Sequence, residues 1–347
     1  MGQIRIVVVD DSVVARELIV AILSTDKDIL VVGEAGNGRD AVEKVRDLKP
    51  DIVTMDVEMP VMNGLDAIEL IMASHPVPIL VVTTLGDART AYAAISRGAL
   101  DLVIKPDINI EAAQEFIDKI KLLSKIRVIT HIGGNRTAKE TKVQDLPVFD
   151  GNPLDSIVAI ASSTGGPEAI SVILSGLPEK FPCPVVIAQH ISDGFVSGMV
   201  EWLKGISKLD IKVASNGDCL AAGTVYVSPS DRHMEVSPER RISLIDRHPK
   251  DIYRPSCDVL LSSVARVYGR KSIGVILTGM GSDGALGMKR IKDAKGTTIA
   301  QDEKTSVVFG MNKVTIDSGC VDKILPLDKI ANEVAHLAGK KQKAALG

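Results

Sequence analysis

Short apolar runs alternate with amphipathic helical patterns along most of this chain of 347 residues. In residues 1–123 the runs that suit strands are Ile4–Val9, Ile29–Val32, Ile52–Met55, Ile79–Val82 and Leu102–Ile104. Helical patterns lie between them, such as Val13–Leu23, Ala41–Leu48 and Leu65–Met72. This alternation predicts an α/β fold, in which a five-stranded parallel sheet has helices on both faces. Such sheets collect their binding residues at the carboxyl ends of the strands.

Polar residues stand where four of these strands are expected to end. They are Asp10-Asp11, Asp56, Thr83-Thr84 and Lys105-Pro106. Neighbouring carboxylates repel one another unless a cation lies among them, and Mg²⁺ prefers such oxygen ligands. A lysine and a hydroxyl group nearby could hold the oxygens of a phosphoryl group. The pattern therefore predicts phosphoryl transfer onto a carboxylate.

The segment resembles the receiver domains of two-component response regulators. The resemblance is carried by Asp10-Asp11, the run from Asp56 to Gly64 (Asp-Val-Glu-Met-Pro-Val-Met-Asn-Gly), Thr83 and Lys105-Pro106. It implies a flavodoxin-like receiver over residues 1–123, with Asp56 phosphorylated by a histidine kinase. It also implies that Asp10, Asp11 and Asp56 bind Mg²⁺ and that Thr83 and Lys105 carry the switch. Leu102 stands where many receivers have an aromatic residue, so we expect no aromatic switch.

Residues 124–151 lack a clear hydrophobic period and contain Gly133-Gly134-Asn135 and Pro147. A stretch of this length without periodicity is unusual inside a compact domain, so we expect a linker here. Residues 152–347 return to alternation, with strand-like runs at Ile157–Ile160, Val185–Ala188, Thr224–Val227, Ile242–Ile245, Ile273–Leu277 and Thr297–Ala300. We predict a second doubly wound, mostly parallel sheet with an antiparallel hairpin around Pro238-Glu239.

The first of these runs leads into Ser162-Ser163-Thr164-Gly165-Gly166-Pro167. A strand that turns sharply into a helix exposes a side chain and aims backbone N–H groups at the same place. Three interpretations of this turn follow. In the first the hydroxyl groups cap the helix, in the second the glycines hold a phosphate, and in the third Ser163 is a nucleophile.

Two further strand ends offer partners for a nucleophile. Gln189-His190 follows one strand, and the loop Thr278-Gly-Met-Gly-Ser-Asp-Gly284 follows another. If these ends converge, Ser163 attacks, His190 transfers the proton, and Asp283 orients the imidazole. The N–H of Met280 is then a candidate oxyanion donor. His233 and Asp258 are rival acid–base candidates.

The second half resembles the catalytic domain of the chemotaxis protein-glutamate methylesterases (CheB). The resemblance is carried by motifs at Ala161–Pro167, Gln189-His190, Val227–Met234, Arg254–Asp258, Leu277–Ala285 and Ala300–Glu303. It implies a phosphorylation-activated serine hydrolase with the triad Ser163, His190 and Asp283. The implied substrates are glutamate methyl esters, which release methanol, and glutamines of chemoreceptors. This chain differs in having Ala161-Ser162 before the nucleophile, where Gly-Ala is usual, and Tyr253, where His is common.

Composition bears on partners and location. A net charge of −3 gives no reason to expect nucleic acid as a partner. The four cysteines are scattered, which favours a reducing, cytoplasmic location over a disulfide framework or a zinc site. No apolar run is long enough to predict insertion into a membrane. We also expect the esterase to need no cofactor. The rival functions are a DNA-binding output domain and a nucleotide-binding module, but neither a basic helix-turn-helix nor a Walker lysine is present.

Overall fold

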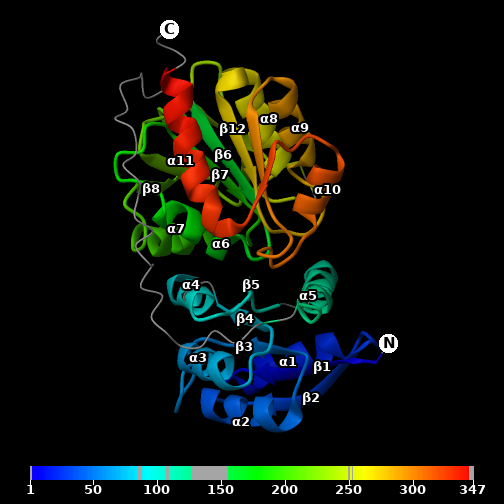
Figure 1. Ribbon diagram of the computed structural model, residues 1–347. Helices are drawn as coiled ribbons and strands as arrows, with labels where there is room; N and C mark the ends of the chain where they lie inside the picture. Colours follow the sequence, from blue (N-terminus) through cyan, green and yellow to red (C-terminus); the bar gives the residue numbers. More distant parts are fainter. Residues whose placement is uncertain are drawn as a thin grey trace. The chain divides into compact units, whose positions relative to one another are not determined.

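The structure is a computed structural model that describes residues 2–84, 88–106, 109–126, 128, 155–248, 251 and 253–343. The chain divides into two compact units, Met1–Thr141 and Lys142–Gly347 (Figure 1). The predicted linker, residues 124–151, lies almost entirely outside the described residues. None of the described helices combines the length and the apolar character needed to cross a bilayer.

The N-terminal unit contains one parallel sheet with the strand order β2-β1-β3-β4-β5. Its strands are β1 (Ile4–Val9), β2 (Ile29–Ala35), β3 (Ile52–Met55), β4 (Ile79–Thr83) and β5 (Asp101–Ile104). Its helices are α1 (Val13–Leu23), α2 (Gly38–Leu48), α3 (Gly64–Ser74), α4 (Ala88–Ser96) and α5 (Ile110–Leu123). The predicted five-stranded, flavodoxin-like sheet is confirmed, and this strand order makes β1 and β3 neighbours at the point where the order reverses.

Capping side chains and alternating burial explain these elements. The side chains of Ser12, Asn37 and Asn63 accept hydrogen bonds from the first turns of α1, α2 and α3. Ile6 and Val8 point to the same face of β1 and are buried in a cluster with residues of α1 and α5. The strands are therefore fixed by aliphatic packing, and their carboxyl ends are left to polar residues.

The C-terminal unit contains a seven-stranded sheet with the order β14-β13-β12-β6-β7-β9-β8, in which every described pairing is parallel. Its strands are β6 (Ile157–Ser162), β7 (Val185–Gln189), β8 (Asp210–Val213), β9 (Thr224–Val227), β12 (Ser272–Ile276), β13 (Thr297–Gln301) and β14 (Lys323–Leu325). The predicted antiparallel hairpin forms a separate two-stranded sheet of β10 (Arg232–Val236) and β11 (Ile242–Asp246).

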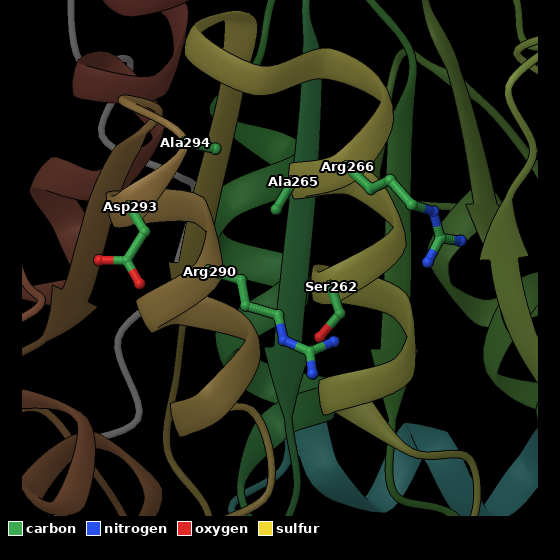
Figure 2. Close-up of a pocket in the computed structure, with 6 residues that line it drawn as sticks. All are labelled: Ser262, Ala265, Arg266, Arg290, Asp293 and Ala294. Atoms are coloured by element: carbon green, nitrogen blue, oxygen red, sulfur yellow. The ribbon is translucent and has the colours of Figure 1, made fainter.

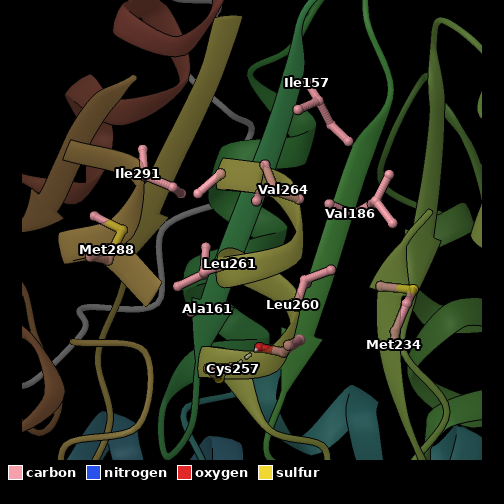
Figure 3. Close-up of a cluster of buried hydrophobic side chains, with 14 of the residues drawn as sticks. Ile157, Ala161, Val186, Met234, Cys257, Leu260, Leu261, Val264, Met288 and Ile291 are labelled. Carbon is pink, nitrogen blue, oxygen red and sulfur yellow. Dashed lines mark hydrogen bonds between the residues drawn. The ribbon is translucent and has the colours of Figure 1, made fainter. Parts of the chain in front are cut away.

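Helices cover this sheet and bury an aliphatic core. They are α6 (Gly166–Ser175), α7 (Val196–Lys204), α8 (Cys257–Tyr268), α9 (Ala285–Asp293), α10 (Met311–Asp317) and α11 (Leu327–Lys343), and a 3₁₀ turn spans Gly269–Lys271. Figure 3 shows Leu260, Leu261 and Val264 of α8 packed over Ala161 of β6 and Val186 of β7. On the opposite face, α11 contacts α6 and the strands β6, β12 and β13.

The strand order decides where the polar residues meet. β6 lies between β12 and β7, and the chain leaves β6 toward β7 but later returns on its other side to form β12. In open α/β sheets ligands bind at such a reversal, beyond the carboxyl ends of the strands. The carboxyl ends of β12, β6 and β7 therefore lie side by side at this reversal.

Candidate active site

Ser163 lies directly after β6, in the turn that leads into α6. Its N–H donates to the carbonyl of Thr278 (3.0 Å), and its own carbonyl accepts from the N–H of Gly166 (2.8 Å). Gly165 has a φ of +75°, a left-handed conformation that glycine adopts without strain, and it is the N-cap of α6. Because no side chain caps this helix, the interpretation of the Ser162 and Ser163 hydroxyl groups as helix caps is wrong.

Gln189, the last residue of β7, ties the two neighbouring strand ends together. Its side-chain N–H groups donate to the carbonyls of Ser163 (2.8 Å) and His190 (2.7 Å), and its side-chain oxygen accepts from the Ser162 hydroxyl (2.6 Å). A Cβ atom on Gly166 would collide with this amide. The amide thus fixes the backbone of Ser163 and His190, and it needs a glycine opposite.

The imidazole of His190 lies between a carboxylate and an aromatic ring. Its Nε2 is 2.8 Å from Oδ2 of Asp283, which leaves Nδ1 as the other nitrogen that can carry or accept a proton. The Tyr253 ring stacks on the imidazole, with 5.1 Å between ring centroids and 14° between planes. His190 is part-buried, and its orientation is fixed from two sides.

Asp283 is buried and accepts four hydrogen bonds. Apart from His190, its donors are the N–H groups of Cys257 (2.6 Å) and Asp258 (2.9 Å) and the hydroxyl of Ser256 (3.1 Å). Burial alone would raise the pKa of Asp283, but the hydrogen bond and charge of His190, together with these N–H groups, hold it below its usual value. The carboxylate therefore stays ionised beside the imidazole.

The loop after β12 brings Gly279, the residue before Met280, against Ser163. A Cβ atom on Gly279 would lie 2.7 Å from the Cβ of Ser163, so only glycine allows this approach. The Gly279 N–H is used by the carbonyl of Val308 (3.0 Å). Within the described residues, the N–H groups of Met280 and Thr164 have no acceptor. Both remain available for a negatively charged oxygen near Ser163.

No hydrogen bond joins the Ser163 hydroxyl to His190 within the part of the chain that the structure describes. Hydrogen bonds of this kind are often long before substrate binds.

The rival candidates lie elsewhere in the network. His233 is buried, accepts from the N–H of Ser256 (2.9 Å) and pairs with Asp251 (2.9 Å). Asp258 accepts from the N–H groups of Gly284 (2.9 Å) and Gly287 (2.7 Å) at the start of α9.

Two hollows lie beside the helix α8. One of about 350 Å³ lies between α8 and α9 and is lined by Ser262, Arg266 and Arg290 among others, but by no member of the Ser163–His190–Asp283 group (Figure 2). Another, of about 330 Å³, is lined in part by His233, Tyr253 and Ser256. Because Tyr253 contacts His190 and Ser256 contacts Asp283, the second hollow adjoins the site.

The polar strand ends of the N-terminal unit also meet. Nζ of Lys105 lies 2.8 Å from a carboxylate oxygen of Asp10 and 2.8 Å from one of Asp56. Asp10 and Asp56 are buried and Asp11 is exposed, and one oxygen of each lies within 4.8 Å of the others. Three carboxylates with a partly exposed side fit Mg²⁺, which takes oxygen ligands and keeps several waters.

Burial and charge adjust this second site. Burial raises the pKa of Asp56, and the charge of Asp10 adds to the effect, while Lys105 opposes it. Burial would lower the pKa of Lys105, but its hydrogen bonds with Asp10 and Asp56 raise it above the usual value. The buried hydroxyl of Thr83 has no partner among the described residues. A phosphoryl group on Asp56 would supply acceptors for Lys105 and Thr83.

Comparison with known proteins identifies the family. The sequence model of the family described as CheB methylesterase matches residues 158–334, and that of the response regulator receiver domain matches residues 6–118. The chain belongs to the CheB methylesterase family. The first match runs from β6 into the first half of α11, so it includes the carboxyl ends of β6, β7 and β12.

Relatives in the CheB family match over nearly the whole chain. A protein-glutamate methylesterase/protein-glutamine glutaminase 3 of Paramagnetospirillum magneticum is 48% identical and covers 99% of both chains. A protein-glutamate methylesterase/protein-glutamine glutaminase of Pyrococcus abyssi is 40% identical and covers 96% of this chain and 93% of the relative. The crystal structure of the Thermotoga maritima CheB methylesterase catalytic domain has a TM-score of 0.51 and 39% identity, covering 52% of this chain and 98% of that domain.

Sequence reasoning did not assign roles to several residues that shape the CheB site. Gln189, Ser256 and Tyr253 hold Ser163, Asp283 and His190 respectively. The signal for Gln189 was its place in the Gln189-His190 motif, directly before the candidate base. The contact of Tyr253 depends on the loop before α8, which no local pattern predicts.

Proposed function

We propose that Ser163, His190 and Asp283 are the catalytic residues of this member of the CheB methylesterase family, and that Asp56 is its phosphorylation site. The chain is a protein-glutamate methylesterase and protein-glutamine glutaminase joined to a receiver. The observation that carries the catalytic proposal is the convergence of the three residues at adjacent strand ends, with His190 Nε2 at 2.8 Å from Asp283.

The proposed reaction begins at the Ser163 hydroxyl. His190, through Nδ1, takes the hydroxyl proton as Oγ attacks the carbonyl carbon of a glutamate methyl ester. Asp283 holds the opposite nitrogen and stabilises the positive imidazolium ring. The N–H of Met280 donates to the oxygen that becomes negative, and the N–H of Thr164, directly after the nucleophile, is a second donor.

Collapse of this intermediate releases methanol, which leaves with the proton from His190, and an acyl group stays on Ser163. Water then attacks the acyl group while His190 takes its proton, and the products are a glutamate carboxylate and free Ser163. With glutamine, ammonia leaves in place of methanol. The same residues therefore serve both reactions of the relatives' printed names.

The receiver supplies regulation in this proposal. Asp56 attacks the phosphorus of a phosphohistidine on a histidine kinase, and the histidine leaves. Asp10, Asp11 and Asp56 would hold Mg²⁺, which would neutralise charge on the phosphoryl oxygens. Lys105 and Thr83 then contact the phosphoryl group. The substrates are chemoreceptors, the methyl-accepting proteins of chemotaxis, and the enzyme acts in the cytoplasm. Phosphorylation activates the hydrolase.

Labelling with a fluorophosphonate tests the nucleophile. Wild-type protein is expected to form one adduct, and Ser163→Ala is expected to form none and to lose ester hydrolysis by on the order of 10⁴- to 10⁶-fold. Ser162→Ala is the matched control, because this neighbouring hydroxyl is buried against Gln189. It should keep its label and most of its turnover. Labelling of Ser163→Ala but not of Ser162→Ala would move the nucleophile by one residue.

A further inference from the structure

The thiol of Cys257 lies against the proposed catalytic pair and has no part in the reaction above. Cys257 is the first residue of α8 and is fully buried, with Sγ 3.5 Å from Nε2 of His190 and 3.4 Å from the carbonyl of Ala188. Ligand atoms of Cys257, His190 and Asp283 all lie within 4.8 Å of one another. A sulfur, a ring nitrogen and a carboxylate oxygen thus converge on one point.

We propose that His190, Cys257 and Asp283 form a binding site for Zn²⁺, or a similar borderline-soft divalent cation, and that binding inhibits the hydrolase. Zinc takes thiolate, imidazole and carboxylate ligands in tetrahedral sites and tolerates an open fourth position. This set contrasts with the all-oxygen group Asp10, Asp11 and Asp56, which suits Mg²⁺.

The distances agree with such a site. Zn–S and Zn–N bonds of roughly 2.3 and 2.0 Å at a tetrahedral angle separate sulfur and nitrogen by about 3.5 Å. The separation of Sγ and Nε2 is 3.5 Å. The separation of Nε2 and Oδ2 is 2.8 Å and would widen to about 3.3 Å, because a metal ion replaces the shared proton. These two separations therefore fit zinc with a shift of about half an ångström at Asp283.

The ion would enter from the His190 side, because the His190 side chain is 14% exposed while Asp283 and Cys257 are almost fully covered. Occupation of Nε2 by zinc removes the hydrogen bond to Asp283 that orients the imidazole. The ion also stops the ring from accepting a proton. The inhibitory part of this inference rests on the proposed function of His190, whereas the binding part does not.

Binding should strengthen as pH rises. A thiol binds zinc as a thiolate, so binding at Cys257 must release the thiol proton. Each proton released makes binding more favourable at higher pH. A surface site built from histidines alone would show this dependence only near the ordinary histidine range.

The test titrates the full chain with Zn²⁺ alone and with Co²⁺ alone, in excess Mg²⁺ so that the receiver carboxylates are occupied. Co²⁺ bound to a thiolate absorbs in the near ultraviolet, and this band reports binding without any catalysis. Hydrolysis of a small ester reports inhibition. The variants are Cys257→Ala and Cys257→Ser, and Cys219→Ala is the matched control because Cys219 is exposed.

Wild type and Cys219→Ala are expected to show the band and to lose hydrolysis with one equivalent of zinc. Both Cys257 variants should lack the band and need at least about tenfold more zinc for inhibition. Absence of the band in wild type, or equal inhibition of folded Cys257→Ser and wild type, would overturn the inference. Serine keeps the side chain small and polar, so this variant guards against a folding defect in Cys257→Ala. The two proposals can fail separately. If the cobalt band appears but fluorophosphonate does not label Ser163, zinc binding stands and only the proposed function is refuted.

Discussion

The side-chain amide of Gln189 contacts the backbone of both proposed partners in proton transfer. In Gln189→Glu, a carboxylate oxygen would face the carbonyls of Ser163 and His190 where an amide now donates. We expect the free energy of unfolding to fall by roughly 2 kcal/mol or more. We expect turnover to fall at least tenfold, because small displacements of catalytic groups are costly. Denaturant unfolding and ester hydrolysis measure the two effects.

The control for Gln189 is Ser162→Ala, which removes one hydrogen bond to the same amide but leaves its two donor contacts in place. Its cost should be about 1 kcal/mol of unfolding free energy with most activity retained. A Gln189→Glu protein as stable and as active as wild type would show that the amide does not position the site.

Tyr253 restricts the imidazole of His190 by stacking rather than by a hydrogen bond. We expect Tyr253→Phe to retain most of the turnover, because the ring face is preserved. Tyr253→Ala should lower kcat by about tenfold with a smaller change in KM, because a mobile imidazole is less often aligned with Ser163. Steady-state hydrolysis of a small ester measures both constants. Equal kcat values for the alanine and phenylalanine variants would show that the Tyr253 ring does not position the imidazole.

At the residue scale, chain position was enough to select part of the candidate site. Ser163, His190 and Asp283 could be selected because each follows a run of strand type, and parallel strands end at one edge. Of the neighbouring contacts, that of Tyr253 comes from the loop that precedes α8, and that of Cys257 from the first residue of the helix. This segment is placed by tertiary packing, so the sequence offered only the Arg254–Asp258 motif and the unusual tyrosine as signals.

A carboxylate at the start of each of the helices α8 and α9 accepts hydrogen bonds from the first turn of the other. Asp283, just before α9, accepts from the N–H groups of Cys257 and Asp258 in the first turn of α8. Asp258 accepts in return from the N–H groups of Gly284 and Gly287 at the start of α9. Negative charges at both helix starts are favoured by the helix dipoles, so the pair locks the proposed catalytic carboxylate into two elements at once.

This exchange predicts a pH-dependent cost for Asp283→Asn. The folded protein holds the pKa of Asp283 below its usual value, so the carboxylate stabilises the fold above the ordinary carboxyl range. That contribution is lost as pH falls through the lowered pKa. The melting temperature of Asp283→Asn should therefore lie below that of wild type at pH 7. The gap should narrow as pH falls below about 4. A gap that is constant from pH 7 to pH 3 would contradict this role of the charge.

The strands that sequence reasoning missed in the larger sheet, β8 and β14, lie at its edges. β8 and β14 contain charged residues such as Asp210, Lys212 and Lys323, which break the apolar pattern of a buried strand. Charged residues are usual on edge strands, because they discourage pairing with other chains. The central strands β6, β7 and β12 are fully buried and apolar over most of their length, and those were predicted.

At the scale of the whole molecule, one chain joins a receiver and a hydrolase. The receiver site holds the buried Asp56 beside Lys105. The candidate hydrolase site holds the His190–Asp283 pair, and Ser163 follows the strand next to that of His190. A charge added at Asp56 can change the second site only through a shift between two states of the molecule. A shift from mostly inactive to mostly active protein requires on the order of 5 kcal/mol of difference between the two states.

The most direct measurement is methanol release from methylated chemoreceptor by the full chain, with and without a small phosphodonor in Mg²⁺. Wild type should release methanol faster when the donor is present. Asp56→Asn should keep the basal rate without a response to the donor, and Ser163→Ala should release almost none under either condition. Stimulation of Asp56→Asn by the donor, or sustained release by Ser163→Ala, would contradict a phosphorylation-activated serine esterase built on these residues.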